Sequence, residues 1–297
     1  MPALQNTVAA GIRFSSRIAP ALGGRLALEA FFATARMRVR DDDSATHDAA
    51  RRATIQVRGR DVTTYRWGTG TRAALLVHGW NGRASQFATL VRDLVGEGYR
   101  VVAFDAPAHG DSPGRRTDVR DWVVAIRLLS DAEGPFGLIV GHSFGAFATL
   151  ASLRDGVEAP RVVSVAGAGE VLAFHDQFAC NVGLPDGARR SFEDGFYRRI
   201  GVSREESDAR YDSLAQPLPL QTELLIVHDR GDRALDVRHS ERLHAAHPAQ
   251  SRLILTQCNG HNRVLSADPV LDAVLAFGDG GLEGASQLSE TPLRATP

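Results

Sequence analysis

The sequence predicts an α/β fold in which helices cover both faces of a mostly parallel sheet. From residue 73 onward, short apolar segments alternate with longer segments of helical pattern, which is typical of successive βαβ units. The apolar segments are those of buried parallel strands. The alternation stops between about residues 170 and 220, so we expect one core that contains an insertion.

The elements follow in order along the chain. After the acidic residues 41–43, segments 53–58 and 62–67 are joined at Gly59 and indicate a hairpin. Further strands are expected at 73–78, 100–105, 136–140, 161–165, 224–228 and 252–256, and helices at 85–95, 117–129, 146–153, 237–246 and 269–277. In such sheets, functional groups gather at the carboxyl ends of the strands.

These patterns suggest five segments. They are an amphipathic helical extension at 1–49, a core at 50–169 and 220–278, a helical cap at 170–219 and a flexible tail at 279–297. The cap segment is rich in aromatic residues, and Phe174, Phe178 and Phe196 are candidates for lining an apolar substrate pocket under a lid. A subdomain that serves only packing is the alternative.

The amino-terminal extension combines apolar residues with arginines. We expect it to dock on the body of the protein, with a membrane-surface anchor as the alternative. No apolar run reaches the length of a membrane span.

Composition narrows the function classes. The chain has 34 basic and 35 acidic residues, a net charge of −1, which argues against a nucleic-acid partner. Its two cysteines, Cys180 and Cys258, are too few for a disulfide framework and lack metal-ligand spacing. We therefore expect a cytoplasmic protein without a metal or other cofactor.

The pattern Gly-x-Ser-x-Gly occurs twice, around Ser112 and around Ser143. A nucleophile elbow needs a strand before the serine, a helix after it, and a backbone N–H on the following residue. Ser112 fails because Pro113 has no N–H and no strand precedes it. Ser143 meets all three conditions, so it is the candidate nucleophile.

A serine nucleophile needs a base, and His261 is the best placed of the ten histidines. It follows the last predicted strand, at the same edge of the sheet as Ser143. The other candidates fit less well: His142 is expected to point away from the serine, His78 ends a strand, and His244 and His247 belong to a helix and its exit.

The carboxylate that orients the histidine should follow the strand at 224–228. Asp232 lies in the turn before the next helix and is preferred to Asp229, which is expected to fix that turn. Glu170 is a more distant alternative.

Two backbone amides are candidates for an oxyanion hole. One belongs to Phe144, directly after the serine, and the other to Trp80, in the glycine-rich turn after the strand at 73–78. A glycine turn with a packing tryptophan is the alternative.

Taken in order, His78-Gly79-Trp80, residues 105–112, Gly141-His142-Ser143-Phe144-Gly145, Asp232 and Gly260-His261 resemble the α/β-hydrolase superfamily. The resemblance spans about residues 50 to 278 and implies a Ser143, Asp232, His261 triad. The segment around Ser112 then matches the family's loop after the fourth strand. Ala108 departs from the family pattern, where glycine is commoner.

The expected activity is hydrolysis of a carboxylic ester or thioester through an acyl-enzyme on Ser143, with an apolar acyl or alcohol group. The same elbow also serves amidases, acyltransferases, carbon–carbon bond hydrolases and cofactor-free haloperoxidases. A non-catalytic protein that binds a small ligand is the contrasting hypothesis.

Overall fold

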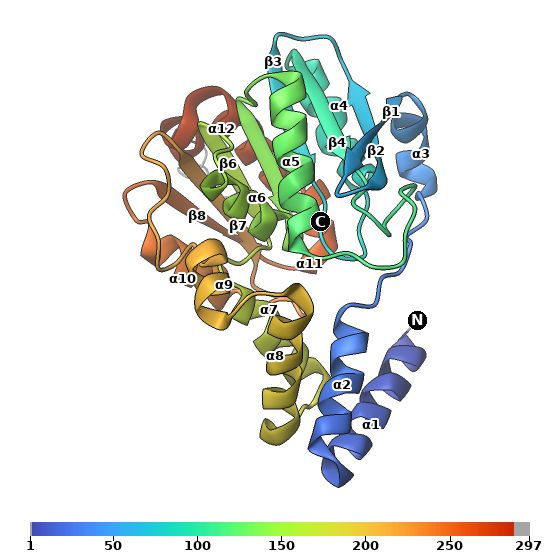
Figure 1. Ribbon diagram of the computed structural model, residues 1–297. Coiled ribbons are helices and arrows are strands. Elements are labelled where there is room, and N and C mark those ends of the chain that lie inside the picture. Colours follow the sequence, from blue (N-terminus) through green and yellow to red (C-terminus); the bar gives the residue numbers. More distant parts are fainter. Residues whose placement is uncertain (1, 288–297) are drawn as a thin grey trace. The chain divides into compact units, whose positions relative to one another are not determined.

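The computed structural model describes residues 2–287, which divide into two compact units. The larger unit comprises residues 34–169 and the chain from Ser213 onward, and it contains the sheet (Figure 1). The smaller unit is helical and comprises residues 2–33 and Glu170–Asp212.

Eight strands form one sheet in the order β1-β2-β4-β3-β5-β6-β7-β8. Their bounds are β1 Arg51–Val57, β2 Arg60–Trp67, β3 Arg72–Val77, β4 Tyr99–Phe104, β5 Leu138–His142, β6 Arg161–Val165, β7 Glu223–Asp229 and β8 Ser251–Thr256. Strand β2 pairs antiparallel with both β1 and β4, and all pairs from β4 to β8 are parallel. The predicted fold class is therefore confirmed.

Helices cover both faces of this sheet (Figure 1). The helices of the α/β unit are α3 Asp41–Asp48, the 3-10 turn η1 Ala84–Phe87, α4 Ala88–Gly96, α5 Val119–Glu133, α6 Phe144–Arg154, α10 Arg238–Ala246, α11 Gly260–Arg263, η2 Val264–Ser266 and α12 Asp268–Gln287. Figure 1 shows α5 and α6 on one face, with α4 and α12 on the other. Apolar residues of β3, β4 and β5 are buried between these layers.

Helix α12 extends beyond the predicted end of the closing helix at residue 277. It continues to Gln287 through a kink at Gly281, where φ is +63° and the neighbouring Leu282 N–H donates to Glu223. The first part of the predicted tail is therefore helical. Residues 288–297 of that tail lie outside the described residues.

The helical unit joins two distant parts of the chain. Its elements are α1 Pro2–Ile18, α2 Pro20–Phe31, α7 Val171–Val182, α8 Asp186–Ile200 and α9 Arg204–Tyr211. Helix α2 packs closely on α8 at Gly24. A side chain at this position would collide with the α8 residues Ala188 and Ser191. The predicted amino-terminal extension thus divides, with residues 2–33 in the helical unit and 34–49 in the α/β unit.

An aromatic cluster forms the core of the helical unit. Phe31 makes edge-to-face contacts with Phe178 and Phe192, both at 5.3 Å between ring centres, and Phe32 stacks on Phe196 at 5.6 Å. Two of the three aromatic residues predicted to line a pocket, Phe178 and Phe196, therefore pack inside this unit. The third, Phe174, is half-buried on α7.

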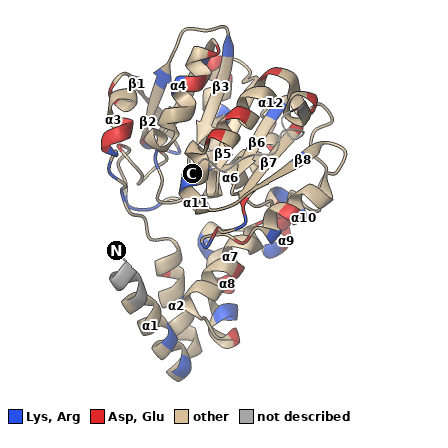
Figure 2. Cartoon of the chain, turned by 180° about the vertical axis from the view of Figure 1, so that it is seen from behind, with Lys and Arg blue, Asp and Glu red and all other residues tan. Residues whose placement is uncertain are grey.

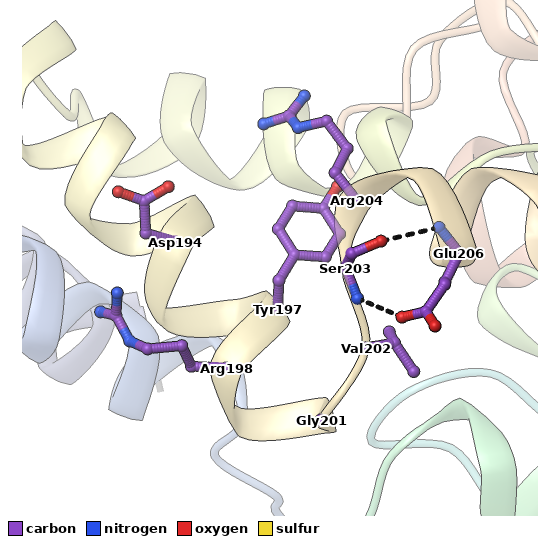
Figure 3. A pocket seen from close by; sticks show the side chains of 8 residues that line it. All are labelled: Asp194, Tyr197, Arg198, Gly201, Val202, Ser203, Arg204 and Glu206. Atoms are coloured by element: carbon purple, nitrogen blue, oxygen red, sulfur yellow. Dashed lines mark hydrogen bonds between the residues drawn. The ribbon is translucent and has the colours of Figure 1, made fainter.

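A surface pocket of the helical unit lies where α8 passes into α9 (Figure 3). Its lining includes Tyr197, Arg198 and Arg204. Ser203 and Glu206 also line it, and their reciprocal hydrogen bonds cap α9. Neither a histidine nor a cysteine lines this pocket, and its serine is occupied in the cap. It is not the candidate active site.

The surface carries both charge signs. Figure 2 shows basic and acidic segments interspersed over the α/β unit, with acidic residues gathered on α3. On α1, Phe14 and Ile18 are 66% and 70% exposed. No helix within residues 2–287 has the length and apolar character needed to cross a membrane.

His175 predicts how the helical unit responds to acid. Its ring is fully buried among Phe31, Phe192 and Phe196, and neither ring nitrogen has a hydrogen-bond partner among the described residues. Burial lowers the pKa of His175 to about 4, although Glu193 lies nearby. The unfolded chain therefore takes up this proton first as the pH falls.

We expect the stability advantage of His175→Phe over the wild type to grow by about 3 kcal/mol between pH 7 and pH 4, measured by urea unfolding. The charged residues near His175 are present in both proteins, so their own titration cancels in the comparison. They are Glu193, Asp176, Arg189 and Arg204. Phe178→Leu, which changes packing without removing a titratable group, should shift stability equally at both pH values. A difference in the free energy of unfolding between His175→Phe and the wild type that is the same at pH 7 and pH 4 would contradict the prediction.

Candidate active site

Ser143 lies on a strained turn between β5 and α6. Its φ of +53° and ψ of −120° place a non-glycine residue in a region that L-residues rarely adopt. Its N–H donates to Val165 O at 2.8 Å, which ties the turn to the end of β6. The hydroxyl is thereby presented at the carboxyl edge of the sheet.

The two glycines of the motif are required by backbone contacts. A Cβ on Gly141 would lie 2.5 Å from Ala146 Cα, and one on Gly145 would lie 2.2 Å from Val77 O. Gly79 is restricted from the other side, because its Cβ would lie 2.9 Å from Ser143 Cβ. Three segments thus meet around Ser143 at distances that only glycine permits.

The structure brings Ser143, His261 and Asp232 together. His261 Nδ1 lies 2.6 Å from Asp232 Oδ2, and its Nε2 lies 3.0 Å from Ser143 Oγ. A carboxylate only accepts hydrogen bonds, so Nδ1 carries the proton and Nε2 accepts from the serine hydroxyl. This is the relay that a serine nucleophile needs.

Asp232 is held as a carboxylate. Burial alone would raise its pKa, but hydrogen bonds from His228, His261 and the Leu235 amide lower it well below its usual value. Its Oδ1 accepts from the Ala234 and Leu235 amides at 2.7 and 3.1 Å, which fixes the plane of the carboxylate. His228, at 3.3 Å from Oδ2, is a contact that the sequence pattern did not indicate.

Asp229 holds the loop that carries His261. Its Oδ2 accepts from Thr256 Oγ1 and from the Asn259 amide, both at 2.9 Å, while Oδ1 accepts from the Gly231 amide. It therefore fixes its own turn, as expected, and also the histidine loop. Glu170 lies at the start of α7, in the helical unit.

The other candidate histidines have different partners. His142 was expected to point away from Ser143. Its ring lies 4.8 Å from that of His261, and its Nε2–H donates to His261 O at 2.8 Å. His78 accepts from the Ala106 amide, His244 contacts Ser251, and His247 donates to Ser213 O. His142 thus supports the backbone of the histidine loop.

Trp80 and Phe144 belong to the two segments next to Ser143. Phe144 is the first residue of α6, and its ring meets that of Trp80 edge to face at 5.3 Å. Both are only half-buried, so they give the surroundings of Ser143 an apolar character. The helix dipole of α6 favours negative charge near the Phe144 amide.

Ser112 has a structural role. Its side chain is fully buried, its hydroxyl donates to Asp105 O, and its Oγ accepts from the Thr63 amide at 2.8 Å. Ala108 lies in the same loop with a φ of +66°. This conformation suits glycine, the residue that the family pattern more often has there.

The arrangement is suited to attack by a serine hydroxyl on an acyl carbon. Among the described residues, no group of three or more His, Cys, Asp or Glu side chains could hold a metal ion. The polar groups that converge at Ser143 are a hydroxyl, an imidazole and a carboxylate.

Comparisons with known proteins place the chain in a family. The family model described as the alpha/beta hydrolase family matches residues 74–280. A search of the curated proteins found no match.

Solved structures that are similar include the mouse alpha/beta hydrolase domain-containing protein 10, with 18% identity, a TM-score of 0.62, and coverage of 77% of this chain and 98% of that one. An esterase from Pyrococcus furiosus has 17% identity and a TM-score of 0.57, with 87% and 95% covered. The thioesterase domain from the curacin biosynthetic pathway has 15% identity and a TM-score of 0.57, with 76% and 99% covered. At these identities the likeness concerns the fold alone.

The close approach at Gly145 gives a stability prediction. Gly145→Ala should lower the free energy of unfolding by about 2–3 kcal/mol, because the new methyl group would meet the backbone oxygens of Val77 and His78. Gly137→Ala is the matched control, since the nearest atom to its Cβ is Ala73 O at an ordinary 3.8 Å. Urea unfolding of both variants measures the difference, and equal effects would contradict the steric explanation.

Proposed function

We propose that this chain, which belongs to the α/β-hydrolase family, is a serine hydrolase of carboxylic esters or thioesters. The observation that carries the proposal is the continuous contact from Asp232 through His261 to Ser143, at 2.6 and 3.0 Å. The esterase and thioesterase among the similar folds are in keeping with it.

In the proposed reaction, His261 Nε2 removes the proton of Ser143 as Oγ attacks the acyl carbon. The imidazolium that forms is stabilised by the ionised Asp232. His261 then protonates the leaving alcohol or thiol, and an acyl-enzyme remains on Ser143. Water, deprotonated by the same histidine, attacks the ester carbonyl of the acyl-enzyme and releases the acid.

The negative charge on the carbonyl oxygen needs donors. We assign this role to the backbone amides of Phe144 and Trp80, which belong to the two segments that flank Ser143. One such donor typically contributes a factor of about 10²–10³ in turnover.

For the substrate, we propose an apolar acyl or alcohol group. The half-exposed rings of Trp80 and Phe144 beside the nucleophile support this choice. A cap role of residues 170–219 is part of the same proposal. A series of p-nitrophenyl esters of increasing acyl length would show which length gives the highest kcat/KM.

The first test concerns the nucleophile. Ser143→Ala should lower ester turnover by roughly a millionfold and abolish labelling by a fluorophosphonate, because the triad acts as a unit. Ser112→Ala, which changes the serine of the other Gly-x-Ser-x-Gly, is the matched control and should still be labelled. Wild-type protein that is neither labelled nor active would refute the enzyme assignment. Undiminished activity in Ser143→Ala would refute the site.

The second test separates the two aspartates. Asp232→Asn should lower kcat by about 10⁴-fold at nearly unchanged KM, since the amide no longer holds the required histidine tautomer. Asp229→Asn should instead lower the stability of the loop at 256–260, with a smaller loss in kcat per labelled site. Steady-state kinetics and thermal unfolding measure the loss in kcat and in stability for each variant. A larger loss in kcat for Asp229→Asn than for Asp232→Asn would exchange the roles of the two aspartates.

A further inference from the structure

The turn that carries Trp80 is fixed at its second half. Residues 79–82 form a tight turn in which the Gly82 N–H donates to Gly79 O at 3.0 Å. Asn81, the residue after Trp80, has a φ of +57°, in the left-handed region that asparagine tolerates better than most residues. The orientation of the Trp80–Asn81 peptide therefore depends on what holds Asn81.

Two contacts hold Asn81. Its N–H donates to His109 Nε2 at 2.9 Å, and its Oδ1 accepts from the Ala35 N–H at 2.7 Å. The first contact comes from the loop after β4, and the second from the segment that precedes α3. The Asn81 side chain itself is exposed, so His109 supplies the buried anchor of the turn.

His109 is set up as an acceptor. Its Nε2 accepts from Asn81, so the ring proton lies on Nδ1, which donates to Pro107 O at 3.0 Å. The side chain is fully buried, and this burial, together with His78, lowers the pKa of His109 to about 3. The ring remains neutral at ordinary pH, and Nε2 can keep accepting.

The same ring contacts the aromatic residues beside the nucleophile. It lies 5.4 Å from the ring of Trp80 and 5.1 Å from that of Trp122, both edge to face. A histidine that only filled space would not need both nitrogens engaged with backbone groups. Its contacts instead reach the turn through the backbone and through the Trp80 side chain.

We propose that His109 is a positioning residue, which accepts the Asn81 N–H and thereby holds the Trp80 amide toward the carbonyl oxygen of a substrate at Ser143. The inference rests on the proposed function. It adds a residue that does not touch the substrate but sets the geometry of the oxyanion site. Such a residue affects kcat more than KM, because the carbonyl oxygen gains its charge only in the transition state.

The test compares two replacements of the ring. His109→Phe keeps a planar ring but removes the acceptor, whereas His109→Gln offers a side-chain oxygen at a similar reach. We expect kcat per fluorophosphonate-labelled site to fall roughly 30-fold in His109→Phe with KM changed by less than about threefold, and to recover at least in part in His109→Gln.

A second readout does not depend on turnover. Hydrogen exchange of the amides at residues 79–82 should be faster in His109→Phe than in His109→Gln, because the Asn81 N–H loses its partner. His247→Phe is the matched control, since it removes another buried histidine that donates to a backbone oxygen, away from this turn. It should lower stability without changing exchange at 79–82.

Each outcome has a distinct meaning. Equal kcat and exchange in His109→Phe and the wild type would overturn the inference while leaving the proposed function intact. An equal loss of kcat and an equal rise in exchange in His109→Phe and His109→Gln would also overturn it, because loss of the hydrogen-bond acceptor would then not be the cause. A wild-type protein without labelling or turnover would overturn the proposed function and the catalytic role of His109 with it. Unequal exchange would then identify His109 only as the anchor of the turn.

Discussion

The close approach of three backbone segments at Ser143 is the constraint on which the α/β unit depends. Gly79, Gly141 and Gly145 allow the turn after β3, the end of β5 and the start of α6 to meet within a few ångströms. Any Cβ at these positions would push these backbone segments apart. The strained φ of Ser143 is maintained because β5, α6 and the contact to β6 leave the turn no alternative.

Electrostatics divides the histidines around this turn into two groups. His78, His109 and His142 are buried, and burial lowers the pKa of each into the range of about 3 to 4, so they remain neutral acceptors and donors of fixed geometry. His261 instead faces Asp232, whose charge is retained at low pH because hydrogen bonds outweigh the cost of burial. His261 thus differs from the three buried histidines in facing a carboxylate and the Ser143 hydroxyl.

Much of this could be predicted because the relevant signals are local. Pro113 excluded Ser112, and the apolar strand before Ser143 with the helix after it identified the turn, since both depend on neighbours in sequence. The contacts of His142, His228 and His109 could not be predicted, because each depends on a residue brought near by the fold. The same reason explains why α2 and α8 were not expected to share a core: no periodicity within either helix specifies its partner.

The helical unit is built from two segments that are far apart in the sequence, and this affects its folding during synthesis. Residues 2–33 leave the ribosome well before residues 170–212, so Phe31 and Phe32 must wait for Phe178, Phe192 and Phe196 while most of the sheet is made. During that time the carboxyl end of α2 lacks the aromatic contacts that it makes in the folded protein. These contacts can form only once α8 has been synthesised.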